Sequence, residues 1–375
     1  MIKTTFFSTE SGAVKRLLIG IMVSTKTKFS GGIMKRSSVA KIFVLAMFFA
    51  LLVVPSLSHA QDKVITLKVA NWFPIAHKQT PLLESWCKDV EKRTNGKVKV
   101  NYYPGGTLVP AVQSYDAVTK GISDVGNHVL GYTVGRFPLT EVLDLPLGYP
   151  NNTIPTKLAN AFYAKFKPKE FDDVKVLWFH AQAPGIIHTK SKPVNKLEDL
   201  KGLKMRTYGS NAKLMSLLGG TPVAMPMTDV YDALSRGVAD GLMCAYEATE
   251  GFRFGEELKF STENYATSYS AVFAIVMNKN KWNSLPPDIQ KIIDGMSPEY
   301  IEKYAAMWDD IEKSGKAYLI KRGNKILSLS NEEQAKWVEK AQPIFDDYVK
   351  RMKEKGLPGD EALKFARDYL KPAKK

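Results

Sequence analysis

Arg206 is the side chain whose type and position most directly suggest chemistry. The pattern at 203–207 predicts a strand, and Arg206 lies near its carboxyl end. Ligands of open α/β sheets bind outside the carboxyl ends of the strands. A guanidinium group can hold a carboxylate with two parallel hydrogen bonds, which an ammonium group cannot do. We therefore expect Arg206 to bind a carboxylate, and a surface ion pair is the alternative interpretation.

The other side chains that could do chemistry are scattered along the chain. Arg136, in the segment 131–138, is a second candidate for anion binding, again with a surface ion pair as the alternative. Four histidines, His77, His128, His180 and His188, are isolated in the sequence. We interpret each of them as a solvated or hydrogen-bonded residue rather than as a catalytic base.

The sequence carries no recognisable enzyme signature. It lacks a G-x-S-x-G turn, a phosphate-binding loop, an H-E-x-x-H pair and a dinucleotide fingerprint. Its two cysteines, Cys87 and Cys244, form no metal-ligand pattern with the five histidines. Both cysteines lie among apolar residues, which favours buried thiols, and a disulfide is the alternative in an oxidising compartment. We expect no catalytic residue, no metal and no cofactor.

Ten residues occur twice in nearly the same form. The segment 115–124 is YDAVTKGISD and the segment 231–240 is YDALSRGVAD, with five identities and five conservative changes. Each copy predicts a helix end, a Gly in the left-handed region and the start of a strand. The two copies end in Asp124 and Asp240, which we expect to accept hydrogen bonds in turns rather than to act as paired acids. The repeat suggests two similar lobes with a cleft between them, and chance similarity is the alternative.

Strands and helices alternate along the chain, which predicts an α/β fold. Strands are expected at 64–70, 97–103, 174–179, 203–207, 222–224, 239–244 and 269–277. A long helix is expected from about 299 to 322, and Ser330 with Glu333 predicts a capping box for the next helix. We expect each lobe to be a mostly parallel sheet flanked by helices, with crossing strands and the long helix between the lobes. Lobe I would comprise 61–185 and about 273–312; lobe II would comprise 186–272 and about 313–375, with the C-terminal helices.

The N-terminal part of the sequence predicts export. A basic start at Met34, an uninterrupted apolar run at 42–54 and small residues before Gln61 are typical of a secretory signal peptide. The run is too short for a spanning helix, although an uncleaved anchor is the alternative. We therefore treat 1–60 as an extension plus signal, functional from residue 34, with cleavage near Ala60 and Gln61. Eight of the 53 basic residues lie in this segment, and the rest are interspersed with acids, so nucleic-acid binding is not expected.

Several motifs, in this order, resemble one known family. They are the signal peptide, NWFP at 71–74, TNGKV at 94–98, YPGG at 103–106, the segment around Arg206 and ALSRGVADG at 233–241. The chain is similar to the solute-binding proteins of tripartite ATP-independent periplasmic (TRAP) transporters, of the dicarboxylate-receptor type. The resemblance implies a two-lobed periplasmic binding protein fold that closes on an organic acid and delivers it to integral membrane subunits. It also implies that Arg206 is the carboxylate-binding residue.

The resemblance also indicates the ligand pocket. Many members have Asn where this chain has Cys244, so one polar contact to the ligand is expected to be missing. The remaining candidates for ligand binding are Trp72, Phe73, Tyr132, Arg136, Gln182, Met227 and Tyr246. We expect a monomeric periplasmic receptor for a monocarboxylate, or a keto or hydroxy acid, with an apolar or aromatic body. A receptor of an ATP-driven importer or sensor system, and a secreted enzyme, are the two alternatives.

Overall fold

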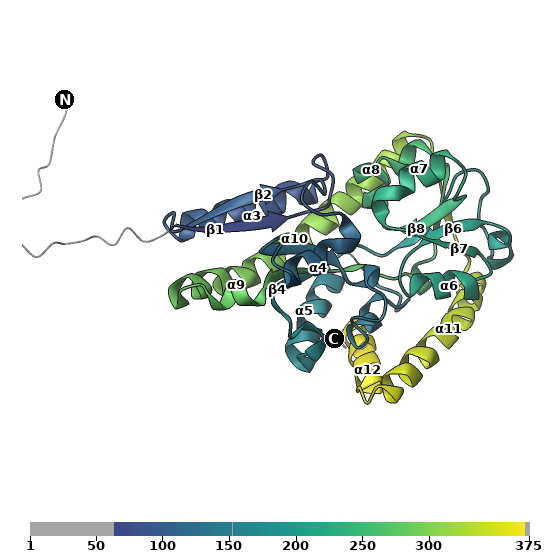
Figure 1. Cartoon of the computed structure of the whole chain (residues 1–375). Helices are drawn as coiled ribbons and strands as arrows, with labels where there is room; N and C mark the ends of the chain where they lie inside the picture. Colours follow the sequence, from purple (N-terminus) through teal and green to yellow (C-terminus); the bar gives the residue numbers. More distant parts are fainter. Residues whose placement is uncertain (1–63, 152, 372–375) are drawn as a thin grey trace, which may run out of the picture. The chain divides into compact units, whose positions relative to one another are not determined.

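The computed structural model of the chain describes residues 64–151 and 153–371, and the predicted signal peptide and cleavage site lie outside them. Two sheets form the framework (Figure 1). Lobe I contains the sheet with strand order β2-β1-β3-β10-β4, and lobe II the sheet with order β11-β9-β5-β8-β6-β7. The predicted α/β class and two-lobed architecture are confirmed.

The strands are short and mostly buried. Those of lobe I are β1 (Ile65–Ala70), β2 (Val98–Tyr103), β3 (Val125–Val129), β4 (Val174–Ala181) and β10 (Val272–Asn278). Those of lobe II are β5 (Ile186–Thr189), β6 (Lys204–Thr207), β7 (Thr221–Ala224), β8 (Gly241–Cys244), β9 (Phe260–Glu263) and β11 (Lys325–Ser328). Every residue of β3, β5, β8 and β10 is buried, as expected for strands covered on both faces.

Helices cover both sheets. They are α3 (Gln79–Arg93), α4 (Ser114–Thr119), α5 (Ile154–Phe166), α6 (Asn211–Leu217), α7 (Val230–Ser235), α8 (Tyr246–Gly251), α9 (Lys279–Asn283), α10 (Pro287–Lys321), α11 (Asn331–Glu354) and α12 (Gly359–Leu370). In α3, Leu83, Trp86, Cys87 and Val90 form the buried face, at the spacing of an amphipathic helix. Among the described helices, none has the length and apolar character needed to cross a membrane.

The two sheets share one topology. In lobe I the parallel strands β2, β1 and β3 are followed by β10 and then β4, each antiparallel to the strand before it. In lobe II the parallel strands β7, β6 and β8 are followed by β5 and then β9, again each antiparallel to the strand before it. The sheets are therefore more mixed than expected, because β10 in lobe I and β5 in lobe II each run antiparallel to both of their neighbours.

The repeated ten residues occupy equivalent places. Gly121 and Gly237 have φ angles of 72° and 71°, and a strand of each sheet follows. Asp124 Oδ2 accepts a hydrogen bond of 2.7 Å from the backbone N–H of Lys68, and Asp240 Oδ2 accepts one of 2.8 Å from Lys204. The expected structural role of both aspartates is confirmed: each ties its turn to the neighbouring parallel strand, β1 in lobe I and β6 in lobe II.

Two chain segments cross between the lobes side by side. The Gln182 N–H donates to the Ala271 carbonyl (3.0 Å), and the Gly185 N–H donates to the Tyr269 carbonyl (2.8 Å). A Cβ on Gly185 would lie 2.2 Å from the Tyr269 ring, so only glycine allows this close approach. The predicted crossing strands are confirmed as this paired connection.

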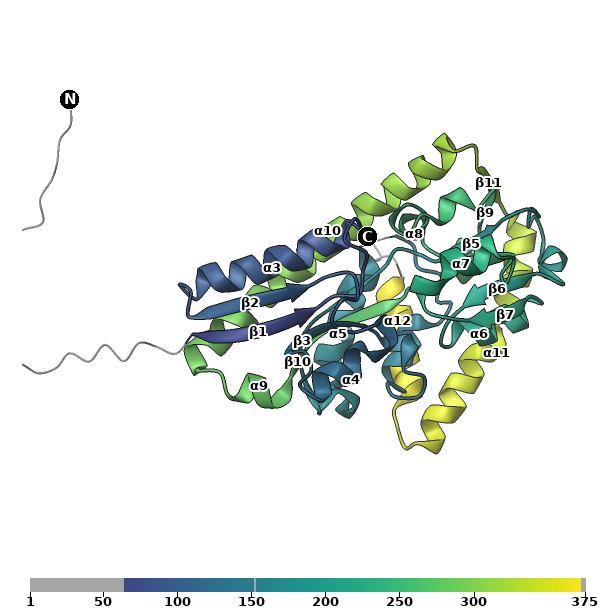
Figure 2. The same cartoon turned by 45° about the horizontal axis from the view of Figure 1, so that its top comes forward.

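The long helix was predicted to start too late. Helix α10 begins at Pro287, about twelve residues before the expected start, and continues through Pro298. A proline inside a helix removes a hydrogen bond and favours a break. Here Ile293, Met296 and Tyr300, on both sides of the proline, are buried in the core of lobe I and hold the helix together. The helix then extends to α8 in lobe II (Figure 2).

The C-terminal helices differ in part from the expectation. Ser330 Oγ accepts the Glu333 N–H (3.2 Å), as a capping box requires, but the Glu333 carboxylate accepts the Leu197 N–H (2.6 Å). Helix α12 packs against α5, with Phe365 lying 6.2 Å from Phe162 between ring centroids. These contacts put α12 beside lobe I, whereas the expected division counted it with lobe II; the limits of the lobes stay a prediction.

Cys87 and Cys244 are both buried and free.

Candidate functional site

A small chamber lies where the carboxyl ends of strands from both lobes meet. Its walls are formed by Trp72, Phe73, Val129, Tyr132, Gln182, Arg206, Tyr208, Met227, Glu247, Phe252, Ala271 and Phe273. Trp72 and Phe73 follow β1, Arg206 is in β6, and Gln182 and Ala271 belong to the crossing segments. The free volume is only about 10 Å³, about enough for one water molecule.

Aromatic rings make up most of the chamber wall. Trp72 stacks on Phe73 with 4.0 Å between ring centroids. Phe252 and Phe273 also lie nearly parallel to Trp72, at 6.2 and 6.4 Å. Stacked faces of this kind bind a flat apolar body through dispersion and burial of apolar surface.

The Arg206 guanidinium is fully buried in this aromatic setting. Its Nε donates to the Met225 carbonyl at 3.0 Å, and its Cζ lies 5.4 Å from the centroid of the Tyr208 ring. Its Nη1 and Nη2 have no hydrogen-bond partner among the described residues. Burying a cation costs several kcal/mol unless an anion or hydrogen-bond acceptors compensate it. The two Nη atoms therefore point to an anion that arrives with the ligand.

Three further polar groups of the chamber have hydrogens to donate and no partner within the described part of the chain. They are Trp72 Nε1, Gln182 Nε2 and Tyr208 Oη. Burial raises the pKa of Tyr208 well above its ordinary value, so its hydroxyl keeps its proton. With Arg206, these groups supply donors from both lobes and from the crossing segment between them. Such a set is suited to carboxylate oxygens, which only accept hydrogen bonds.

Six of the nine residues predicted for the site meet in this chamber: Arg206, Trp72, Phe73, Tyr132, Gln182 and Met227. Tyr132 Oη accepts the Met227 N–H at 2.9 Å, which joins the two lobes. Their contact with a ligand remains a proposal.

The other three predicted residues lie elsewhere. Arg136 forms an ion pair with Asp173 and sits over the Tyr115 ring, so its charge is already compensated. Cys244 is buried in β8, opposite Ile186 of β5. The Tyr246 hydroxyl donates to Glu263 at 3.1 Å, away from the chamber. Whether these three residues line the chamber depends on their neighbours in space, which the spacing in the sequence does not indicate.

Several wall residues were not anticipated from the sequence: Val129, Tyr208, Glu247, Phe252, Ala271 and Phe273. One signal could have identified Tyr208. Because Lys68 and Lys204 bond equivalent aspartates, Tyr208 lies as far beyond Lys204 as Trp72 lies beyond Lys68. Phe252 and Phe273 have no such local signal, since folding brings them in from distant segments.

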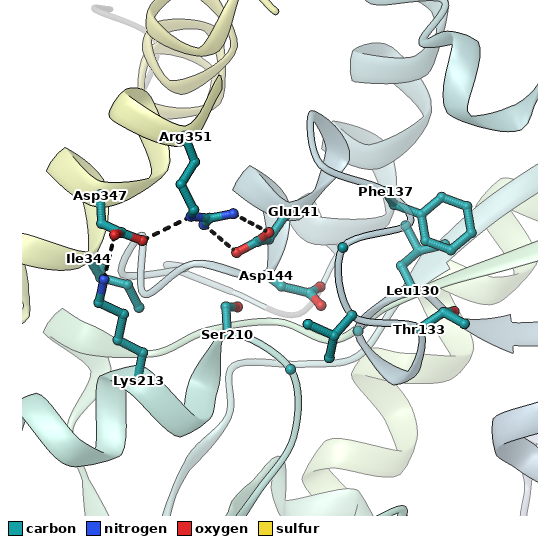
Figure 3. A pocket seen from close by; sticks show the side chains of 14 residues that line it. Leu130, Thr133, Phe137, Glu141, Asp144, Ser210, Lys213, Ile344, Asp347 and Arg351 are labelled. Carbon is teal, nitrogen blue, oxygen red and sulfur yellow. Dashed lines mark hydrogen bonds and ion pairs between the residues drawn. The ribbon is translucent and has the colours of Figure 1, made fainter. Parts of the chain in front are cut away.

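A larger cavity, of about 310 Å³, lies between the segment 130–144 and helices α6 and α11 (Figure 3). Both of its basic side chains, Lys213 and Arg351, already pair with acidic residues of the lining. Arg351 makes two hydrogen bonds to Glu141, of 3.1 and 2.8 Å, and Lys213 lies 2.8 Å from Asp347. Because these two cations are already paired, this cavity is less suited than the chamber to binding an anionic ligand.

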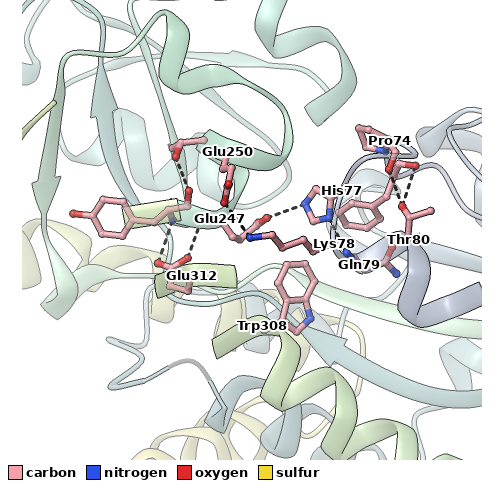
Figure 4. A network of polar contacts seen from close by, with 12 residues as sticks. Pro74, His77, Lys78, Gln79, Thr80, Glu247, Glu250, Trp308 and Glu312 are labelled. Atoms are coloured by element: carbon pink, nitrogen blue, oxygen red, sulfur yellow. Dashed lines mark hydrogen bonds and ion pairs between the residues drawn. The ribbon is translucent and has the colours of Figure 1, made fainter. Parts of the chain in front are cut away.

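A buried polar network borders the chamber on the other side (Figure 4). His77 Nε2 lies 2.9 Å from Glu247 Oε2. The Glu312 carboxylate of α10 accepts the backbone N–H groups of Tyr246 (3.1 Å) and Glu247 (3.0 Å). Burial, together with the charge of Glu247, raises the pKa of Glu312 to about 8, although the two N–H groups favour its ionised form.

Comparison with known proteins agrees with this geometry. Residues 71–351 match the family of bacterial extracellular solute-binding proteins, family 7. The chain belongs to this family. A TRAP periplasmic solute-binding protein from Desulfovibrio salexigens is 35% identical, with a TM-score of 0.73 over 83% of this chain and 98% of that one. The predicted family is confirmed, and its members are periplasmic receptors.

Two further solved relatives of the receptor carry aromatic acids. A TRAP solute-binding protein from Rhodoferax ferrireducens, in complex with copurified benzoate, is 29% identical, with a TM-score of 0.77 over 82% of this chain and 97% of that one. A marine metagenome protein specific for aromatic acid ligands, in complex with 3-hydroxybenzoate, is 30% identical, with a TM-score of 0.78 over 83% and 99%.

Glu312 predicts a pH dependence of stability. A carboxyl whose pKa is higher in the folded than in the unfolded chain stabilises the fold below its ordinary pKa, and this contribution is lost as the pH rises through the folded value. We expect wild type to lose stability relative to Glu312→Gln between about pH 5 and 8, by on the order of 1.4 kcal/mol per unit of pKa shift. Chemical unfolding at a series of pH values measures this difference. Glu361→Gln, at an exposed position of α12, is the control, and a pH-independent difference for Glu312→Gln would contradict the assignment.

Proposed function

We propose that the receptor binds an organic monocarboxylate with an apolar or aromatic body in this chamber and delivers it to the membrane subunits of a TRAP transporter. The observation that carries the proposal is the buried Arg206 guanidinium, whose two Nη atoms have no partner within residues 64–151 and 153–371, in a chamber walled by aromatic rings. In the proposed complex, Arg206 holds the carboxylate, while Trp72, Gln182 and Tyr208 supply further donors. Phe252 and Phe273 would cover the body of the ligand.

Energetics favour a ligand with a substantial apolar part. A receptor of micromolar affinity needs about −8 kcal/mol. A charge-assisted hydrogen bond contributes about 1.5–3 kcal/mol, so the Arg206 contacts supply only part of this free energy. Burying apolar area against the rings, at about 25 cal/mol per Å², would supply the rest. The aromatic acids bound by two relatives support the same ligand class.

The proposal requires the lobes to separate and close. A free volume of about 10 Å³ is too small for an aromatic acid, so the ligand must enter an open form and displace side chains as the cleft closes. We propose that the two lobes move as nearly rigid bodies about the crossing segments. Lobe I would comprise 61–185 and about 273–312, and lobe II 186–272 and about 313–375. Helix α12 is the exception: because it packs against α5, it would move with lobe I.

Two further parts of the proposal concern processing and turnover. We propose that the segment 34–60 directs export and is removed, and that the ligand is released unchanged. The family consists of receptors, which supports binding without catalysis. N-terminal sequencing of the exported protein and mass spectrometry of the recovered ligand would test these two points.

Replacing Arg206 tests its assigned role. Arg206→Ala should weaken binding of the best acid by about 2–4 kcal/mol, because the buried carboxylate would lose its partner. Arg206→Lys should also bind poorly, since an ammonium group cannot form the two-pronged contact. Arg136→Ala is the matched control, because that arginine pairs with Asp173 outside the chamber. Isothermal titration calorimetry measures the affinities, and an unchanged affinity in Arg206→Ala would refute the assignment.

The ligand class is tested with a thermal-shift panel of organic acids. Benzoate and related aromatic monocarboxylates should stabilise the receptor more than succinate, malate or fumarate. Among the described residues that line the chamber, Arg206 is the one basic side chain, so a second carboxylate would be buried without a charged partner, which is costly. A clear preference for a C4-dicarboxylate over every larger monocarboxylate would overturn this part of the proposal.

A further inference from the structure

One buried hydrogen bond joins the two lobes at the edge of the chamber. His77 lies between β1 and α3 of lobe I, and Glu247 lies in α8 of lobe II, 170 residues further along the chain (Figure 4). Their side chains are only 1% and 3% exposed, and Nε2 and Oε2 are 2.9 Å apart. The His77 ring packs against Phe73 and Phe252, at 4.7 and 5.3 Å between centroids. The bond exists only while the lobes are in contact.

The backbone fixes the tautomer of His77. The Gln79 N–H donates to His77 Nδ1 at 3.1 Å, so Nδ1 acts as an acceptor and carries no proton. The ring proton is therefore on Nε2, which donates to Glu247. His77 thus donates to Glu247 from Nε2 and is held in one orientation by its own chain segment.

Glu247 depends on this donor in the closed arrangement. Within the described residues, no Lys or Arg forms an ion pair with its carboxylate, and His77 is the side chain that hydrogen-bonds to it. The other titratable groups nearby are Glu312 of α10, which accepts the Glu247 N–H and repels its charge, Lys316, one α10 turn beyond Glu312, and Cys244 and Arg206, of which Arg206 lines the same chamber as Glu247. Lys78 and Glu250 lie at the exposed rim. A buried carboxylate without a partner is costly, whereas in an open cleft water would solvate it.

We propose that His77 and Glu247 are a positioning pair that decides whether the cleft can close over its ligand. The pair need not touch the acid held by Arg206. It permits closure because, among the described residues, His77 is the side chain that donates a hydrogen bond to the carboxylate that closure removes from water. This inference rests on the proposed ligand chamber and adds a determinant outside the predicted ligand contacts.

The contribution of the pair can be isolated with four proteins. His77→Phe keeps the aromatic packing against Phe73 and Phe252 but removes the donor, so Glu247 would be buried without a partner. Glu247→Gln keeps an acceptor for His77 and removes the charge. The double variant His77→Phe with Glu247→Gln leaves no uncompensated charge. Glu250→Gln is the matched control, because the neighbouring contact between Lys78 and Glu250 also joins the lobes but is exposed, at 3.4 Å.

Benzoate affinity by calorimetry and radius of gyration by small-angle scattering, with and without benzoate, are the readouts. His77→Phe should bind benzoate about 10–100-fold more weakly and have a larger radius than wild type, while circular dichroism shows an intact fold. The double variant should return to within about fivefold of wild type, and Glu250→Gln should change affinity less than twofold.

Two outcomes would overturn the inference. One is a His77→Phe protein with the radius and affinity of wild type. The other is a double variant that binds no better than His77→Phe, because then the loss would not come from the uncompensated Glu247 charge. If the wild-type protein does not bind benzoate, the proposal of benzoate as a ligand is wrong. The radii of gyration of the ligand-free proteins then still show whether the pair holds the lobes together.

Discussion

The burial of the Arg206 guanidinium is the physical constraint on which our interpretation of the structure depends. Its two Nη atoms have no hydrogen-bond partner in the part of the chain that the structure describes, and burying a cation away from water without such a partner is unfavourable. A cleft that opens to water and closes on a carboxylate removes this penalty. In the proposed function, the two lobes, their paired crossing segments and the aromatic lining would allow this exchange of water for a bound acid.

The internal repeat explains how a nearly symmetric framework builds an asymmetric site. Asp124 and Asp240 fix Lys68 and Lys204 in equivalent positions, which makes β1 of lobe I equivalent to β6 of lobe II. In that alignment Ala70 of lobe I corresponds to Arg206 of lobe II. One lobe therefore supplies the cation and the other supplies Trp72 and Phe73, so a complete site exists only when the lobes meet. The bond between His77 and Glu247 adds a condition on that meeting, since closure must also compensate a buried acid.

Much of this arrangement could be predicted from local patterns in the sequence. The repeat with its glycines predicted the two-lobed α/β architecture, and the strand-end position of Arg206 predicted a residue that lines the chamber, because both patterns depend on residues close together in the chain. Phe252, Phe273 and Glu247 could not be found in this way, since tertiary folding brings them to the chamber from distant segments. Arg136 had the same chemistry as Arg206, and only the neighbouring Asp173 distinguishes it. The start of α10 was misplaced because burial of its flanking residues outweighs the local effect of Pro298.

The central claim, that an unpaired cation in a dry aromatic chamber selects a carboxylate, can be tested by changing only the charge of the ligand. Thermal shifts of the wild-type receptor are measured for a set of organic acids, each beside its own neutral amide, at equal concentration. The account predicts that every stabilising compound is an acid and that its amide, nearly identical in shape, gives little or no shift. An amide that stabilises the receptor as much as its acid would contradict the account.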